Sequence, residues 1–259
     1  MGFVVKMIKK LLLALFFPCY AFAQEDILIN SDATALVPNL KYIKGLMRKN
    51  DEFSEISPAP ILGLFQIAVG TQIYYLSADG RYLLRGDMLD LKEGENISEN
   101  HKKNLRAIVL KDIPAKDLII FSPFSDEGKK AAYSVMIFSN LSCSYCRSVY
   151  EDIPKYLEMG VEVRIAPFVH AHKNSQAYKR ITEVWCSPDR KTALERNYKE
   201  QKTVPAFCDD SFLDADYITA LKLGISAIPS YILEDGELLN GYIAPEALIK
   251  ILQHKEGKN

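Results

Sequence analysis

Residues 133–160 read YSVMIFSNLSCSYCRSVYEDIPKYLEMG. The apolar run at residues 133–138 is typical of a buried strand, and the stretch after Cys146 has the pattern of a helix that Pro154 should kink. Cys143 and Cys146 lie three positions apart at the junction between strand and helix. Such a pair has three interpretations: a redox centre, half of a zinc site, or structural thiols.

The position of Cys143 at the start of a helix has a chemical consequence. The first helical turn carries unpaired N–H groups and the positive end of the helix dipole, and both stabilise an anion. Cysteines in this setting can have a pKa lowered by one to several units from about 8.5, and each unit corresponds to about 1.4 kcal/mol in favour of the thiolate. Cys146, one turn further along the same face, is near enough to form a disulfide with Cys143.

The N-terminus indicates the compartment. Three lysines precede the apolar run LLLALFF, and Ala-Phe-Ala follows shortly after it as a small-x-small cleavage site. This pattern predicts a secretory signal peptide over residues 1–23. The alternative, a membrane anchor, requires about twenty apolar residues, and Pro18 interrupts this run too early. Cleavage would also remove Cys19 and leave four cysteines.

The composition of the remaining chain excludes some function classes. Cleavage leaves 236 residues with 29 Lys and Arg against 33 Asp and Glu, a net charge of about −4, so nothing suggests nucleic-acid binding. No second segment is long enough to cross a membrane. We expect a soluble protein of one large or two modest domains in an oxidising compartment, where paired cysteines tend to form disulfides.

The second half of the chain alternates strands with helices. The continuous apolar runs at 133–138 and 161–165 are each followed by helical stretches, which implies a sheet covered on both faces. Residues 230–239 have the pattern of a hairpin around Glu234-Asp235-Gly236, and Pro245 opens a final helix. The order is strand, helix, strand, helices, hairpin, helix, which indicates an α/β domain.

The first part of the mature chain has a different pattern. Apolar residues recur at helical spacing from Pro38 to Met47, and β-rich runs at 72–76 and 81–84 flank a turn at Asp79-Gly80. This predicts a small helix-plus-sheet unit of about seventy residues, which is marginal alone. Its last strand would leave an open edge, and dimerisation through that edge is one solution.

Between the two parts, residues 92–104 are polar and rich in turn formers. The stretch after Ser98, a possible N-cap, is basic on most sides but places Leu105, Ile108 and Val109 on one side. This pattern predicts a connecting helix that contacts a domain along one stripe. The alternative is one more helix of a single domain.

These features together resemble a known family. A strand, a CxxC at a helix start and a late Ile228-Pro229 before a hairpin resemble a thioredoxin-fold oxidoreductase. Further residues of the chain resemble those of the DsbC/DsbG periplasmic disulfide isomerases. In the second half they are Tyr145 within CSYC, Val184-Trp185-Cys186, Cys208-Asp209, Leu223 to Pro229 and Gly241-Tyr242. In the N-terminal unit they are Pro58-Ala59-Pro60 and Gly86-Asp87-Met88.

The resemblance implies a fold and an assembly. The fold is an α/β thioredoxin-like catalytic domain with a helical insertion (116–259), joined by a linker helix (96–115) to a small N-terminal α+β, cystatin-like dimerisation domain (24–95). The assembly is a homodimer with an apolar cleft that accepts misfolded, disulfide-containing secreted proteins. Its location would be the periplasm, and a DsbD-type membrane reductase would keep it reduced.

The resemblance also implies roles for the CxxC residues. Cys143 would be the nucleophile and Cys146 the resolving cysteine, while Ser144 and Tyr145 tune the redox potential. No acidic residue lies in 133–139, where thioredoxins carry a buried aspartate, so the proton acceptor for Cys146 is left open. The chemistry needs no cofactor.

Ile228 and Pro229 would form a cis-proline turn opposite the CxxC, where an extended substrate segment can pair with the backbone. The alternative is an ordinary trans loop proline. Family isomerases often have threonine before this proline and glycine or proline after the first cysteine, where this chain has Ile228 and Ser144. The sequence therefore leaves three hypotheses open: an isomerase, a reductase or oxidase of the same fold, or a holdase chaperone.

Cys186 and Cys208 are assigned a structural role. The 21 residues between them are too many for a compact active-site motif and suit a structural disulfide, worth about 3 kcal/mol in the chain-entropy view. A zinc site from all four cysteines is disfavoured because one C-x-x-C is present where two are usual. We therefore expect no metal.

Overall fold

The computed structural model describes residues 38–43, 53–123, 131–169, 172–173, 175–201 and 208–256. The predicted signal peptide lies outside these residues. The helix expected from Pro38 is described only as far as residue 43, where Ile43 is buried against the N-terminal sheet. Among the described residues, no helix is both long enough and apolar enough to span a membrane.

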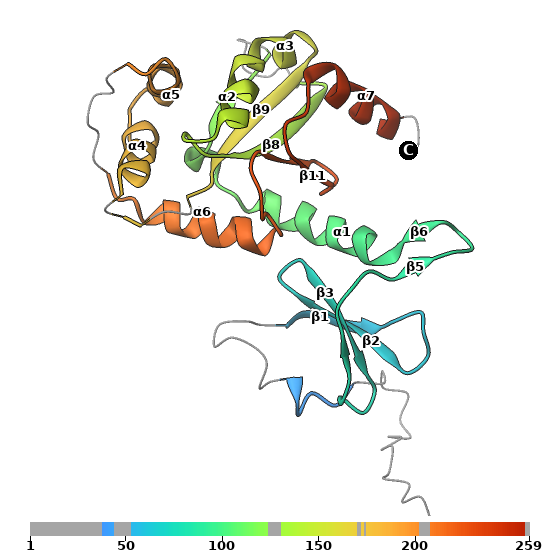
Figure 1. The fold of residues 1–259 in the computed structure, drawn as a ribbon. Coiled ribbons are helices and arrows are strands. Elements are labelled where there is room, and N and C mark those ends of the chain that lie inside the picture. The colour runs from blue at the N-terminus through green and yellow to red at the C-terminus, as the bar shows by residue number, and fades with distance from the viewer. Residues whose placement is uncertain are drawn as a thin grey trace, which may run out of the picture. The chain divides into compact units, whose positions relative to one another are not determined.

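The N-terminal part is a four-stranded antiparallel sheet in the order β1-β2-β3-β4 (Figure 1). Its strands are β1 (Phe53–Pro58), β2 (Leu64–Val69), β3 (Gln72–Ser77) and β4 (Leu83–Leu84). Because side chains alternate along a strand, Ile67 and Leu76 pack with Ile43 on one face, whereas Ala68 and Tyr75 are buried on the other.

The predicted hairpin turn joins β3 to β4, and Gly80 has a φ of 74° there. Strand β4 is shorter than the sequence suggested, because only Leu83 and Leu84 pair with β3. It is the last strand of its sheet, and Tyr82, Leu83 and Leu84 are exposed. Within the described residues this edge is therefore apolar and open. A short two-stranded ribbon follows, made of β5 (Leu89–Asp90) and β6 (Glu95–Asn96).

The second half contains a five-stranded sheet in the order β11-β10-β8-β9-β7. Strands β8 and β9 are parallel, and the other neighbours are antiparallel. The strands are β7 (Ile119–Phe121), β8 (Tyr133–Ser139), β9 (Val161–Pro167), β10 (Ser230–Leu233) and β11 (Leu238–Asn240). From β8 onward the elements follow the predicted order of strand, helix, strand, helices, hairpin and helix, whereas the edge strand β7 was not predicted.

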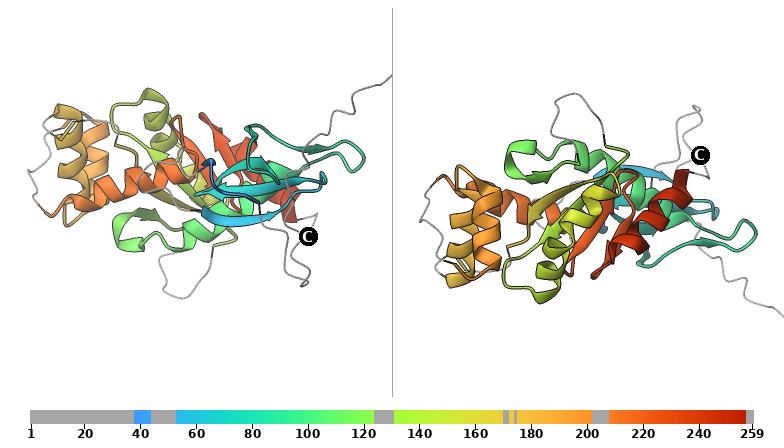
Figure 2. Two further views of the ribbon diagram at one scale, coloured as in Figure 1. Left: turned by 90° about the horizontal axis from the view of Figure 1, so that it is seen from below. Right: turned by 90° about the horizontal axis from the view of Figure 1, so that it is seen from above.

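Helices cover both faces of this sheet (Figures 1 and 2). They are α1 (Ile97–Lys111), the short 3-10 helix η2 (Ala115–Asp117), α2 (Ser144–Glu151), α3 (Ile153–Glu158), α4 (Gln176–Trp185), α5 (Arg190–Tyr198), α6 (Ser211–Lys222) and α7 (Pro245–Glu256). Ile137 of β8 belongs to the core with Tyr156 and Leu248 of α3 and α7. Its neighbour Phe138 belongs to the core with Leu223. The continuous apolar strands are thus buried on both sides, as predicted.

Two features of the helices differ from the sequence prediction. Pro154 does not kink one helix but lies in the first turn of a second helix, α3, where a missing N–H costs nothing. The N-cap of α1 is Asn96, whose side chain accepts the N–H of Glu99, and not Ser98. Ser98 is instead buried, and its hydroxyl accepts the N–H of Met88 at 2.7 Å.

The contact stripe of α1 was also predicted only in part. Leu105 packs on the N-terminal sheet and Val109 on the second sheet, so the helix contacts two cores. Ile108 was expected in the stripe but is exposed. Arg106 takes the buried position instead, with 4% of its surface exposed. The stripe is therefore partly polar, which hydrophobic periodicity cannot reveal.

Candidate active site

The loop between β8 and α2 is shaped by Asn140. Its side-chain oxygen accepts the N–H of Ser142 at 2.8 Å, and its amide nitrogen donates to the carbonyl of Phe168 at 2.9 Å. An asparagine that bonds to backbone two residues ahead is a common turn device. These two hydrogen bonds attach the loop to the end of β9 and place Cys143 at the start of α2.

Cys143 is the N-cap of α2. Its backbone is extended, with φ −95° and ψ 122°, and its sulfur accepts the N–H of Cys146 at 3.3 Å. In this position a sulfur does what a serine or aspartate oxygen does at other helix starts. The N–H of Cys146 and the positive end of the helix dipole are therefore both directed at the Cys143 sulfur. The residue is partly exposed, so other molecules can reach it.

Cys146 has the opposite environment. It is 1% exposed, and burial, followed by its contact with Cys143, raises its pKa to about 12. The hydroxyl of Ser139 lies beside Cys146 and acts in the other direction. Tyr198, which is also buried, shares a hydrogen bond with Ser139, and burial raises its pKa as well. At neutral pH Cys146 is therefore a protonated thiol, and within the part of the chain that the structure describes its side-chain partners are Cys143 and Ser139.

The Ile228-Pro229 turn faces Cys143. The peptide bond between the two residues is cis, and the carbonyl oxygen of Ile228 lies 3.8 Å from the Cys143 sulfur. Pro229 is buried, and its carbonyl accepts the N–H of Gly241 at 2.9 Å. The hydroxyl of Ser230 reaches the carbonyl of Ala227 at 2.6 Å. Hydrogen bonds on both sides of the proline thus fix the turn beside the reactive sulfur.

A groove of about 990 Å³ opens beside Cys143. Helices α2, α4 and α5 contribute most of its wall, which is formed by Leu141, Ser142, Cys143, Ser144, Arg147, Gln176, Arg180, Glu183, Asn197, Glu200 and Gln201. Ser144 and Tyr145, between the two cysteines, are both exposed, and Ser144 lines the groove. A polypeptide segment can therefore approach the sulfur without displacing core residues.

Two residues of this groove were not expected from the sequence. Arg147, one turn after Cys143, forms an ion pair with Glu200 at 3.3 Å. Glu200 has a φ of 57°, a left-handed conformation that usually favours glycine. Only the fold brings them together, because 53 positions separate them along the chain. The sequence signal was limited to the i,i+4 spacing of Arg147 from Cys143.

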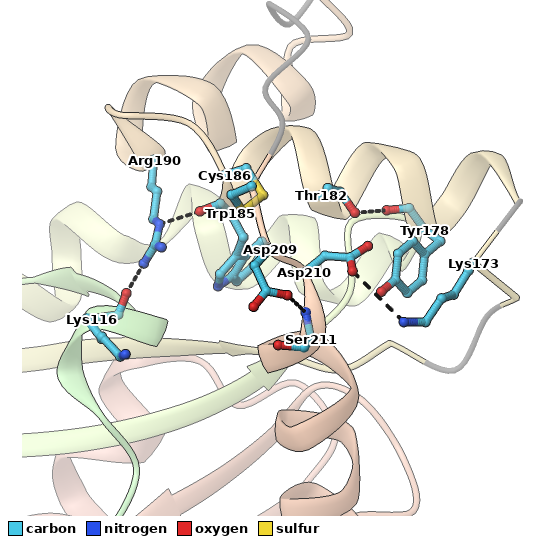
Figure 3. Close-up of a disulfide and its surroundings, with 11 residues drawn as sticks. Lys116, Lys173, Tyr178, Thr182, Trp185, Cys186, Arg190, Asp209, Asp210 and Ser211 are labelled. Atoms are coloured by element: carbon cyan, nitrogen blue, oxygen red, sulfur yellow. Dashed lines mark hydrogen bonds and ion pairs between the residues drawn. A yellow bond between two sulfur atoms is a disulfide. The ribbon is translucent and has the colours of Figure 1, made fainter.

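Cys186 and Cys208 form a disulfide with a Cα–Cα distance of 5.4 Å (Figure 3). It joins the C-cap of α4 to the residues before α6. The neighbouring Trp185 is buried and donates from its indole N–H to the carbonyl of Asp117 at 3.0 Å. Because these two sulfurs are bonded to each other, they are unavailable for a zinc site shared with the CxxC. Among the described residues, Cys143 and Cys146 are free cysteines.

Comparisons with known families divide the chain into two segments. Residues 35–99 match the family described as "Disulfide bond isomerase protein N-terminal domain". Residues 124–256, just over half of the chain, match the family described as "Thioredoxin-like domain". The second match contains the five-stranded sheet's β8 to β11 and the CxxC.

Individual relatives span most of the chain. The thiol:disulfide interchange protein DsbC of Dickeya dadantii is 28% identical over 213 residues, which cover 81% of this chain and 85% of the relative. DsbC of Escherichia coli K12 is 25% identical over 205 residues, which cover 78% and 82%. The solved structure of Helicobacter pylori DsbG is 14% identical, with a TM-score of 0.42 over 75% of this chain and 98% of that one.

Proposed function

The chain belongs to the thioredoxin-like domain family, and from that membership we propose how its free cysteines exchange disulfides. It is a thiol:disulfide interchange enzyme with a DsbC-type N-terminal segment, like the relatives it matches. We assign Cys143 as the nucleophile and Cys146 as the resolving cysteine. The observation that carries this assignment is their contrast: the partly exposed sulfur of Cys143 accepts a helix N–H, whereas Cys146 is buried.

The reaction starts with the Cys143 thiolate. It attacks one sulfur of a substrate disulfide, so that a Cys143–substrate disulfide forms and the second substrate sulfur leaves as a thiolate. A different substrate thiolate can then attack the mixed disulfide. This step releases Cys143 as a thiolate and leaves the substrate with a rearranged disulfide and no net change in oxidation state. That sequence is isomerisation.

The second exit from the mixed disulfide uses Cys146. Its thiol loses a proton and attacks the Cys143 sulfur, which forms the Cys143–Cys146 disulfide and releases the substrate as a dithiol. The substrate gains two electrons and the enzyme loses two, so a reductant has to restore the pair. Because burial raises the pKa of Cys146, its thiol has to lose its proton before it can attack, so this step depends on a proton acceptor.

Substrate capture is assigned to the Ile228-Pro229 turn and the adjoining groove. The Ile228 carbonyl lies beside the Cys143 sulfur, so an extended segment that pairs with this backbone presents its cysteine to the nucleophile. Ser144 and Tyr145 are exposed at the mouth and can contact the same segment. Misfolded proteins with wrong disulfides are substrates of the right kind, because their extended segments are accessible.

The proposal extends to location and assembly. Residues 1–23 direct the chain to the periplasm, and residues 24–95 form a dimerisation domain that residues 96–115 link to the catalytic domain at 116–259. The open, apolar edge at β4 supports pairing with a second copy. In an oxidising compartment, a membrane reductase of the DsbD type is the electron donor that keeps the CxxC reduced.

Refolding of a protein with scrambled disulfides tests the proposal. Cys143→Ser should abolish recovery of native disulfides, whereas Lys179→Ala, an exposed change on α4, should leave it intact. Full recovery with Cys143→Ser would contradict the nucleophile assignment. Suppression of aggregation by this variant, without disulfide exchange, would show a holdase activity that does not depend on the thiols.

A further inference from the structure

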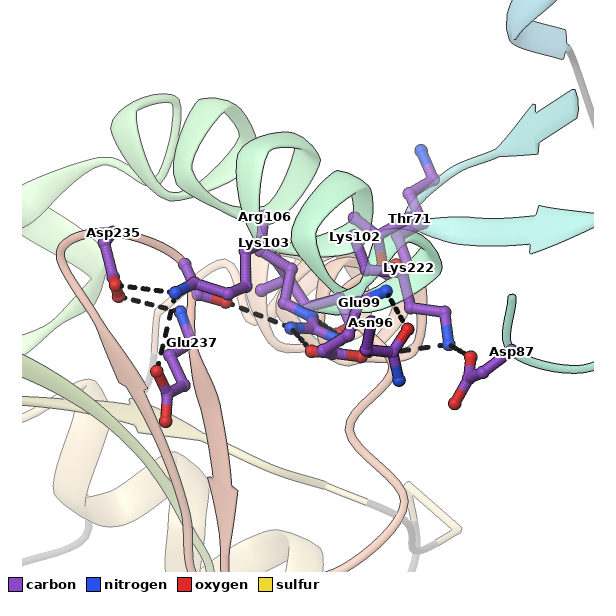
Figure 4. Close-up of polar contacts among 12 residues, drawn as sticks. Thr71, Asp87, Asn96, Glu99, Lys102, Lys103, Arg106, Lys222, Asp235 and Glu237 are labelled. Carbon is purple, nitrogen blue, oxygen red and sulfur yellow. Dashed lines mark hydrogen bonds and ion pairs between the residues drawn. The ribbon is translucent and has the colours of Figure 1, made fainter. Parts of the chain in front are cut away.

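A buried arginine ties the linker helix to the catalytic domain. Arg106 of α1 is 4% exposed, and its guanidinium makes three hydrogen bonds (Figure 4). Its Nε donates to the carbonyl of Leu223 at 3.2 Å, and its Nη1 donates to the carbonyl of Gly236 at 3.0 Å. Nη1 also lies 2.7 Å from the carboxylate of Glu99. A charge so deeply buried is tolerated because its Nε and Nη1 donors are paired and a carboxylate lies beside it.

The two carbonyls that Arg106 holds bracket one segment. Leu223 is the C-cap of α6, and Gly236 lies in the turn after β10. Between them lie the Ile228-Pro229 turn and β10 itself. One rigid guanidinium therefore fixes both ends of the segment that carries the turn facing Cys143.

Helix α1 lies directly on the Gly236 turn. A Cβ atom added at Gly236 would lie 1.9 Å from the carbonyl oxygen of Lys103 and 2.8 Å from the N–H nitrogen of Ala107, both on α1. Charge supports the same contact, since Lys103 pairs with Asp235 at 2.9 Å (Figure 4). This end of the segment is thus held by close packing as well as by Arg106.

The other end is held from the N-terminal sheet. Thr71, in the turn between β2 and β3, is fully buried. Both its N–H, at 3.2 Å, and its hydroxyl donate to the carbonyl of Lys222, the residue before Leu223. That carbonyl lies at the end of α6, where helices have no internal donor to offer. Residues of the first half of the chain thus bind three backbone carbonyls of the second half.

We propose that Arg106, supported by Thr71, is a positioning residue that sets the place of the Ile228-Pro229 turn opposite Cys143. The linker helix and the N-terminal sheet would then control substrate capture within one chain, in addition to any role in dimerisation. The inference rests on the proposed function, because it assigns the turn to substrate binding. It predicts a defect in the capture of polypeptides and not in the reactivity of the Cys143 sulfur.

The test compares Arg106→Met, Arg106→Lys and a matched control, Asn104→Met, at an exposed position of the same helix. Each protein is assayed, with reduced glutathione as the electron donor, on a fluorescence-quenched peptide disulfide and on cystamine, a small disulfide too short to pair with the turn. We expect Arg106→Met to raise KM for the peptide about tenfold and kcat by less than twofold in either direction. Arg106→Lys keeps the positive charge but loses the planar guanidinium that binds two carbonyls at once, and it should raise KM for the peptide about threefold. The rate with cystamine should stay within twofold for every variant.

Two results would overturn the proposal. One is a peptide KM for Arg106→Met within twofold of the Asn104→Met value. The other is an equal loss with peptide and cystamine, which would show a general effect on the active site. If Arg106→Met does not fold, Arg106→Lys and Thr71→Val carry the same test, with Thr71→Val expected to raise the peptide KM by about twofold to threefold. Failure of the proposed function would differ, since the unaltered protein would then react with neither disulfide.

Discussion

Among single residues, the two cysteines of the CxxC differ in burial: Cys143 caps α2 with its sulfur, whereas Cys146, in the first turn of the same helix, is buried. Cys143 supplies the acceptor for the N–H of Cys146, and Cys146 is buried behind it. On this contrast we base the proposal that Cys143 is the sulfur that meets the substrate. It also predicts what happens when the buried sulfur is removed.

Cys146→Ala should trap the enzyme on its substrates. Without the resolving thiol, the Cys143–substrate disulfide lacks its internal exit, so mixed disulfides should accumulate. Non-reducing gel electrophoresis after rapid acid quenching measures them, and reduction should release them. Cys143→Ser is the matched control and should form none. Absence of trapped species with Cys146→Ala would contradict the assignment of nucleophile and resolving residue.

Asp216 provides a pH-dependent test of stability. It is 8% exposed on α6, and one of its carboxylate oxygens has no hydrogen-bond partner. Burial, followed by the charge of Asp117, raises its pKa from 3.8 to about 7. At a pH between these two pKa values, the Asp216 carboxyl is ionised in the unfolded chain and protonated in the folded chain. The carboxyl therefore destabilises the fold increasingly from about pH 4 to pH 7, and fully above pH 7.

Asp216→Asn should remove this cost. We expect the free energy of unfolding to rise by roughly 1–3 kcal/mol at pH 8 and to change little at pH 4, because each pKa unit corresponds to about 1.4 kcal/mol. Urea titrations at the two pH values measure the difference. Asp214→Asn, at an exposed position of the same helix, should change stability by less than about 0.5 kcal/mol. An equal effect of Asp216→Asn at both pH values would contradict the assignment.

Local pattern predicted some site residues and not others. The start of a helix after a buried strand is visible in the sequence, so the capping position of Cys143 could be predicted. The hydroxyl groups near Cys146 could not be predicted. They belong to Ser139 and Tyr198, which lie 59 positions apart and meet only in the folded chain. The Arg147–Glu200 ion pair could not be predicted for the same reason, because the fold brings together two residues that are distant in the sequence.

At the scale of elements, the strands and helices of the second half followed from their apolar patterns, whereas α1 shows the limits of that method. Its helical pattern was visible, but its cap and its buried residue were not. Asn96 and Ser98 are both good caps, and only the tertiary contact of Ser98 with Tyr75 and Met88 decides between them. Arg106 is buried because the opposing surface consists of carbonyls, which no periodicity of apolar residues can predict.

The Cys186–Cys208 disulfide holds α4 and α6 together and should matter for stability alone. Replacing both cysteines by serine removes a constraint on a loop of 21 residues, worth about 3 kcal/mol. We expect the melting temperature to fall by roughly 6–12 °C, measured by circular dichroism. At a temperature where the variant is folded, its rate with cystamine should equal that of the unaltered protein. A loss of that rate without a lower melting temperature would assign these cysteines to catalysis.

In the molecule as a whole, the described residues form a four-stranded and a five-stranded sheet, and helix α1 packs on the cores of both. The sequence indicated two parts because its pattern changes from hairpin strands to alternating strands and helices. The polar contacts between the parts could not be read from pattern, since Thr71 and Arg106 bind backbone carbonyls that lie far away along the chain.

Deleting residues 24–95 should separate assembly from thiol chemistry. We expect the truncated protein to be a monomer that still reacts with cystamine but has lost isomerisation of a scrambled protein. Light scattering after size exclusion measures the mass, and refolding measures the activity. A Leu83→Asp, Leu84→Asp variant of the full chain, altered only on the open edge of β4, should also be monomeric. A truncated protein that remains a fully active dimer would contradict the assignment of this domain.

The reactivity of Cys143 is tested by the rate at which the reduced protein reacts with iodoacetamide at pH 7, followed by mapping of the labelled residue. We expect Cys143 to react several times faster than free cysteine, since its partly exposed sulfur lies at the start of α2, and Cys146 to remain unlabelled. Reaction of Cys143 no faster than free cysteine, or first labelling of Cys146, would contradict this expectation.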